Sequence, residues 1–285
     1  MKLIVADSWG FLMKMLQAYT KNFNPELYLD SKLNRLHTVL SYNKRKTLIV
    51  GVSGGIDSAV VLAMLTKLKQ KYPEAGYEIV PVIAPIFGSN GTTGQLEASQ
   101  DAYLVCQSFG YMEPILYELG DVANEYKYNL EIKTEYVQQQ VDYWLRPTAF
   151  YKVAMEHEDS ILVSTTNYSE YVTGWFSQYL DILGVHPIID IRKGQVYDLA
   201  RYLNVPEKII EAAPVGGLAS GGTDEELLGF TYEDLDKYLS ASDQVDSNTL
   251  VAITDRIESS AFKRFRFNPD FINAVSVFHK LYGDD

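Results

Sequence analysis

The sequence predicts an α/β fold in which a parallel sheet carries helices on both faces. Short apolar runs rich in β-branched residues alternate with segments of helical periodicity, which is the pattern of successive βαβ units. The run Thr47–Val52 is apolar almost throughout, as expected of a strand buried on both faces. A glycine-rich turn follows this run directly, at the position where such sheets bind ligands.

The elements follow in order along the chain. Residues 1–46 are expected to be helical, with a break at Asn24-Pro25. After the first strand, a helix is expected through Leu62, Leu65 and Leu68. Later strands are expected from Glu78, Glu113 and Ser160, and later helices from Leu96, Thr148 to His157, Gly194, Pro206 and about Tyr232. We expect one domain, 1–285, with a helical start (1–46), an α/β core (47–230) and a helical end (231–285).

Composition narrows the class of protein. The excess of 37 acidic over 25 basic residues gives a net charge of −12, which repels nucleic-acid backbones, and the one basic run, FKRFRF from Phe262, is short. No apolar run reaches the roughly 18 residues that a membrane span needs, and the first 16 residues lack a signal-peptide cleavage site. The lone Cys106 is expected to be a core thiol, and the four histidines are scattered. We therefore expect a soluble cytoplasmic protein that binds neither nucleic acid nor membrane.

The most informative motif lies between the first strand and its helix. Glycines allow close approach of the backbone to an anion, and the N–H groups that open a helix point toward it. A carboxylate beside phosphate is favourable when magnesium lies between them, which explains Asp57. The alternative is a tight turn whose Ser or Asp caps the helix. The pattern lacks the lysine of a Walker loop, and its glycine spacing differs from the dinucleotide fingerprint. Its residues are Gly51, Val52, Ser53, Gly54, Gly55, Ile56, Asp57 and Ser58.

This loop resembles the pyrophosphate-binding loop of the ATP pyrophosphatases, enzymes that cleave ATP to AMP and pyrophosphate while they activate a carbonyl oxygen as an adenylate. Within that group the chain is similar to the NAD synthetases, and the resemblance is colinear from about Asn24 to Pro269. The segments that carry it are STTNYSE from Ser164, VTGWF from Val172, PIIDIRKGQVYDLARYL from Pro187 and GTDEELLGFTYEDLD from Gly222.

The resemblance implies roles for particular residues. Asp57 and Lys193 would be catalytic, Asp57 and Glu170 would ligate magnesium, and Gly51 to Ser58 with Thr165 and Lys193 would bind ATP. Arg146, Lys263 and Arg264 would bind the acid substrate. The implied cofactors are ATP and Mg2+, and the implied assembly is a homodimer. Because no amidase-like segment is recognised, ammonia or another small amine is the expected nitrogen donor.

The chain departs from the family pattern mainly at positions whose residues are expected to bind the dinucleotide. Trp144 and Gln178 stand in place of an arginine and a lysine, Phe262 replaces a histidine, and residues 212–217 lose a lysine, a threonine and an acid. Charged hydrogen bonds contribute about 1.5–3 kcal/mol each. Either Arg192 and Arg266 compensate, or the acceptor acid has changed. The glycine-rich segment 214–223 is either a surface loop or a lid over the site.

Three functions remain open at this point. The first is amidation of deamido-NAD with ammonia to give NAD, AMP and pyrophosphate. The second applies the same chemistry to a different carboxylate or amine. The third is a nucleotide-binding protein without turnover.

Overall fold

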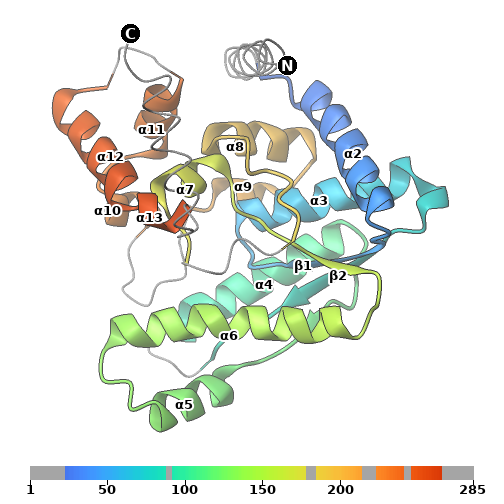
Figure 1. Ribbon diagram of the computed structural model, residues 1–285, viewed down its shortest axis with the longest axis horizontal. Helices are drawn as coiled ribbons and strands as arrows, with labels where there is room; N and C mark the ends of the chain where they lie inside the picture. Colours follow the sequence, from blue (N-terminus) through green and yellow to red (C-terminus); the bar gives the residue numbers. More distant parts are fainter. Residues whose placement is uncertain (1–22, 88–91, 178–183, 214–222, 241–244, 265–285) are drawn as a thin grey trace, which may run out of the picture.

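The computed structural model describes residues 23–87, 92–177, 184–213, 223–240 and 245–264, and Figure 1 shows their arrangement. Its first half alternates strands and helices, as expected. The elements up to the last strand are α2 (Pro25–Tyr42), β1 (Thr47–Gly51), α3 (Ile56–Lys71), the 3-10 turn η1 (Pro73–Ala75), β2 (Glu78–Ile83), α4 (Thr92–Ser108), β3 (Ile115–Leu116), α5 (Gly120–Asn129), α6 (Glu135–Met155) and β4 (Ser160–Val163).

The second half of the chain is helical in the part that the structure describes. Its helices are α7 (Tyr168–Thr173), α8 (Lys193–Tyr202), α9 (Glu207–Glu211), α10 (Asp224–Leu228), α11 (Tyr232–Leu239), α12 (Ser247–Ser259) and α13 (Ala261–Arg264). The sequence predicts a helical C-terminal segment from residue 231, and the described part of that segment contains α11 to α13. The single-domain division stays a prediction, because 1–22 and 265–285 lie outside the described residues.

The four strands form a parallel sheet in the order β3-β2-β1-β4. The chain therefore runs from β1 outward through β2 to β3, and then returns to the opposite side of β1 for β4. The crevice between the carboxyl ends of β1 and β4 is thus the topological switch point, where open α/β sheets bind ligands.

Helices cover both faces of the sheet, which confirms the predicted fold class (Figure 1). Leu48 and Val50 of β1 pack into the large core made with α2, α3, α8 and α9. Ile49, on the other face, packs against Val153 and Ala154 of α6. This alternation follows from the two-residue period of a strand, because neighbouring side chains point to opposite faces. Cys106 is buried in the large core, as the sequence predicts, and burial raises the pKa of its thiol to about 12.

Two predicted boundaries are wrong. The helix expected from Thr148 begins at Glu135, and Pro147 lies inside it rather than before it. The strand expected from Glu113 is reduced to Ile115–Leu116, because it pairs with β2 only at Val82 and Ile83. In both cases the tertiary structure overrides the local signal: α6 packs along a face of the sheet, and the edge strand pairs only with the last two residues of β2.

Candidate active site

The site lies at the carboxyl ends of β1 and β4. β1 continues into residues 52–55 and then α3, and β4 continues into residues 164–167 and then α7. Because β1 and β4 are parallel neighbours, the first turns of α3 and α7 open at the same edge of the sheet. This topology brings Asp57, the second residue of α3, close to Glu170, the third residue of α7.

The glycine-rich loop is held in shape by its own hydroxyl groups. Ser58 Oγ donates to the carbonyl of Gly55 at 2.9 Å and accepts from the backbone N–H of Ser53 at 3.2 Å. Gly55 N donates to Ser53 Oγ at 3.3 Å. The N-cap residue of α3 is Gly55, and no side chain in the described part of the chain accepts from the first N–H groups of the helix. The alternative in which Ser or Asp caps this helix is therefore wrong, and the helix start is left open to an anionic ligand.

Gly54 has a backbone conformation that favours glycine. Its φ is +89°, and a Cβ there would lie 2.3 Å from the carbonyl oxygen of Ala98 in α4. The loop passes α4 this closely because the residue has no side chain.

We expect Gly54→Ala to lower the free energy of unfolding by at least about 1–3 kcal/mol, because the new methyl group strains the backbone and collides with α4. The matched control is Gly55→Ala, whose Cβ would lie 3.5 Å from its nearest neighbour, at an ordinary φ of −83°. Denaturant unfolding of both variants measures the difference. Equal stabilities would contradict the conformation of the loop described here.

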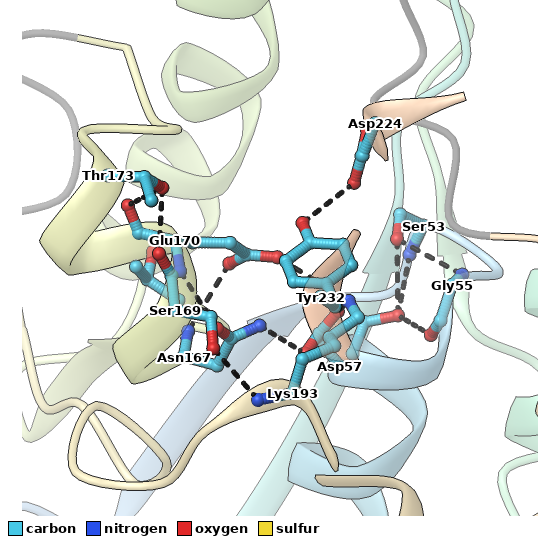
Figure 2. Close-up of polar contacts among 12 residues, drawn as sticks. Ser53, Gly55, Asp57, Asn167, Ser169, Glu170, Thr173, Lys193, Asp224 and Tyr232 are labelled. Atoms are coloured by element: carbon cyan, nitrogen blue, oxygen red, sulfur yellow. Dashed lines mark hydrogen bonds and ion pairs between the residues drawn. The ribbon is translucent and has the colours of Figure 1, made fainter. Parts of the chain in front are cut away.

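Asp57, Glu170 and Lys193 meet in one cluster (Figure 2). Lys193 Nζ lies 2.5 Å from Asp57 Oδ2 and 3.6 Å from Glu170 Oε1. The lysine side chain is 2% exposed and each carboxylate 16%. Two carboxylates at the carboxyl ends of β1 and β4 thus share one nearly buried ammonium group.

The position of Lys193 is set by the first turn of α8. The backbone N–H of Lys193 donates to Ser169 Oγ at 3.0 Å, and Gly194 N donates to Asp236 Oδ2 at 3.0 Å. Arg192 Nη1 donates to the carbonyl of Asp236 at 2.6 Å. These bonds tie α8 to α7 and α11, so the lysine enters the cluster from a fixed helix terminus.

The charges in the cluster depend on one another. Burial raises the pKa of Glu170 above its usual range, the charge of Asp57 raises it further, and Lys193 opposes both. Burial acts to lower the pKa of Lys193, but Asp57 and Glu170 outweigh it, so the pKa of the ammonium lies above its ordinary value. Lys193 is therefore a permanent cation at neutral pH. Its charge stabilises the ionised forms of Asp57 and Glu170, which burial disfavours.

The donor set fits magnesium in the presence of a nucleotide. No group of three or more His, Cys, Asp or Glu able to hold an ion is found among the described residues. Magnesium is commonly held by one or two carboxylates together with substrate phosphates and water, and two carboxylates are what Asp57 and Glu170 offer beside the open start of α3.

Two further side chains enter the cluster from α10 and α11, and the sequence reading assigned no role to them. The hydroxyl of Tyr232 donates to Asp224 Oδ2 at 3.2 Å, and the ring of Tyr232 lies 5.2 Å from Lys193 Nζ (Figure 2). Burial raises the pKa of Asp224, which is 4% exposed. The ring of Tyr232 thus lies against the ammonium group of Lys193.

The other candidate residues have mixed positions. Thr165 lies in the turn between β4 and α7, beside the cluster in sequence. Arg146, on α6, donates from Nε to the carbonyl of Ala84 at 3.1 Å, just after the carboxyl end of β2. It therefore lies at the same edge of the sheet as the loop.

Lys263 and Arg264 are held by the end of α7. Lys263 Nζ donates to the carbonyls of Gly174 and Phe176, both at 2.9 Å. Arg264 donates from Nη1 to the carbonyl of Val172 at 2.6 Å. Their role in binding a substrate acid stays a prediction, and it requires that these carbonyl contacts be shared or exchanged. Gln178, residues 214–217 and Arg266 lie outside the described residues.

Comparison with known proteins adds a family to this geometry. The model of the family described as NAD synthase matches residues 28–266. Proteins named NH3-dependent NAD+ synthetase are similar: that of Alkaliphilus oremlandii is 32% identical over 234 residues, covering 77% of this chain and 86% of the relative. That of Mycoplasma genitalium is 30% identical over 221 residues, covering 74% and 82%.

Solved structures agree in fold. A structure named as NMN synthetase from Francisella tularensis has a TM-score of 0.77 at 26% identity, covering 87% of this chain and 99% of its own. An NH3-dependent NAD synthetase from Campylobacter jejuni has a TM-score of 0.68 at 21% identity, covering 87% and 99%. In the described part of the chain, no helix has the length and apolar character needed to cross a bilayer. On the family match and these identities, the chain belongs to the NAD synthase family, whose members are ligases that form an amide with the use of ATP.

Proposed function

We propose that this protein adenylates the nicotinate carboxylate of deamido-NAD and then transfers ammonia to it, giving NAD, AMP and pyrophosphate. The observation that carries the proposal is the meeting of Asp57, Glu170 and Lys193 beside the open start of α3. Relatives at 30–32% identity that are named NH3-dependent NAD+ synthetase support the choice of acceptor and amine.

In the first step, a carboxylate oxygen of the acceptor attacks the α-phosphorus of ATP, and the bond from that phosphorus to the bridging oxygen breaks. The leaving pyrophosphate is held by the main-chain N–H groups of Ile56 to Ser58, which open α3, and by the dipole of that helix. Lys193, fixed at the start of α8, offsets the charge that develops on the leaving oxygens. Asp57 and Glu170 would hold magnesium, which supplies charge neutralisation across the phosphates.

In the second step, ammonia attacks the carbonyl carbon of the adenylate. The nitrogen loses a proton, the carbon–oxygen bond to AMP breaks, and the amide and AMP are released. Water must be kept from the adenylate in this interval, because it would return the free acid.

A second acceptor is favoured by specific observations. The solved structure named as an NMN synthetase is similar to this chain at a TM-score of 0.77, and Trp144 and Phe262 stand where the family pattern has an arginine and a histidine. The same amidation of nicotinate mononucleotide would give NMN, and this acceptor carries one phosphate group where a dinucleotide carries two.

The test is to incubate the protein with magnesium, ATP and ammonium, adding deamido-NAD or nicotinate mononucleotide in separate reactions. The proposal expects pyrophosphate and NAD with deamido-NAD. If only nicotinate mononucleotide gives an amide product, the proposed acceptor is wrong and the proposed adenylation and amidation chemistry stands. ATP binding without AMP formation with either acid would reject both acceptors in favour of a nucleotide-binding protein without turnover.

We further propose that the protein is a homodimer and that it acts in the cytoplasm. Both follow from the resemblance of the chain to its family. Sedimentation at micromolar concentration tests the first of them, with a mass near twice 32.2 kDa expected.

A further inference from the structure

Asn167, like Lys193, contacts both Asp57 and Glu170. It lies between β4 and α7, is fully buried, and forms the N-cap of α7. Its side-chain oxygen accepts from the backbone N–H of Glu170 at 3.0 Å. Its side-chain amide donates to Asp57 Oδ1 at 2.8 Å, and its own backbone N–H donates to Glu170 Oε2 at 3.2 Å (Figure 2).

These bonds divide the oxygens of the two carboxylates. Asp57 Oδ1 and Glu170 Oε2 are held by Asn167, whereas Asp57 Oδ2 and Glu170 Oε1 face the ammonium group of Lys193. One residue therefore fixes one oxygen of each acid and leaves the other oxygen of each facing the same cation.

Capping alone does not require asparagine. A helix N-cap needs an acceptor oxygen, which Ser, Thr and Asp also provide. Asparagine adds an N–H donor on the same side chain, and this donor reaches Asp57 on another element, 110 positions away in sequence. Aspartate would instead place a third carboxylate against the pair.

We propose that Asn167 is a positioning residue that turns Asp57 and Glu170 into one divalent-cation site. The proposal rests on the proposed function, because it assumes that this pair binds magnesium with ATP. Residues that orient metal ligands without touching the metal typically change metal affinity or activity by about 10- to 100-fold when they are replaced.

The test is Asn167→Ser, which keeps an acceptor for the α7 cap and removes the donor to Asp57. Binding of Mn2+ to the protein in the presence of a non-hydrolysable ATP analogue is measured by the loss of the free-ion electron paramagnetic resonance signal. We expect binding about 10- to 100-fold weaker than in the wild type. The magnesium concentration for half-maximal pyrophosphate release should rise in parallel, with most of the rate recovered at saturating magnesium.

The matched control is Asn24→Ser, the same substitution at the exposed N-cap of α2, where Asn24 accepts from Leu27 N at 3.1 Å. It should leave Mn2+ binding unchanged. If Asn167→Ser does not fold, Asn167→Thr removes the same donor with a second capping side chain. Unchanged Mn2+ binding in a folded Asn167 variant would overturn the inference and leave Asn167 as a cap. Absence of Mn2+ binding in the wild type would instead contradict the proposed function.

Discussion

Asp57→Asn is expected to reduce pyrophosphate release by about 100- to 1,000-fold at saturating ATP. The carboxylate is the one acid in the loop, it shares the ammonium group of Lys193 with Glu170, and with Glu170 it is the proposed magnesium ligand. Loss of several kcal/mol of charge stabilisation, about 3–4 kcal/mol here, corresponds to that factor in rate. The assay is the initial rate of pyrophosphate release as a function of magnesium concentration.

The control for Asp57→Asn is Asp198→Asn on α8. Asp198 is 55% exposed and pairs with Arg201 at 3.5 Å, so the same chemical change is made on the surface of a helix that contributes to the site. Its rate should stay within about twofold of the wild type, since exposed ion pairs contribute little. A fully active Asp57→Asn protein would exclude a metal-binding role for the loop.

Lys193→Met is expected to lower the free energy of unfolding by about 3–5 kcal/mol at pH 8. Removing the cation leaves Asp57 and Glu170 nearly buried without their shared partner, and breaking a buried ion pair has a cost of this size. The same variant should release almost no pyrophosphate, because the cation proposed to offset the charge on the leaving oxygens is gone.

The stability loss in Lys193→Met should be smaller at pH 5.5 than at pH 8. The folded protein holds a proton on Glu170 more tightly than the unfolded chain does, because burial and Asp57 raise the pKa of Glu170. The stability from that proton is fully present below the ordinary Glu pKa of about 4.3 and is lost as pH rises through the raised pKa. Without Lys193, which opposes the shift, this dependence becomes steeper.

Urea unfolding at the two pH values measures this effect. Lys152→Met is the control, because Lys152 and its partner Glu156 are 55% and 53% exposed, and the change should alter stability by no more than about 0.5 kcal/mol. A loss in Lys193→Met that is the same at both pH values would show that Glu170 does not titrate in this range.

The sequence predicted the parts of the fold that have strong local signals. The apolar run of β1 predicts a buried strand, and the small residues after it predict a turn that can bind a ligand. The helix predicted from Thr148 begins at Glu135 and contains Pro147, a residue type that usually ends or kinks a helix, and its later part packs through Val153 against Ile49 of β1.

The candidate site was predictable where pattern and topology coincide. Asp57 and Glu170 each follow a strand, and parallel pairing of those strands brings them together. Asn167 was missed, although an N-cap residue three positions before a glutamate is a capping-box signal that the sequence contains. Its contact with Asp57 joins segments 110 positions apart in sequence, and no local pattern encodes such a pair.

The central claim is that the acceptor carboxylate attacks the α-phosphorus of ATP and that pyrophosphate, bound at the loop, is the leaving group. Acceptor labelled with 18O in its carboxylate tests this claim most directly, by mass spectrometry of the nucleotide and phosphate products. The account predicts one 18O atom in AMP for each amide formed and none in pyrophosphate. Label in inorganic phosphate, with ADP as the nucleotide product, would contradict it.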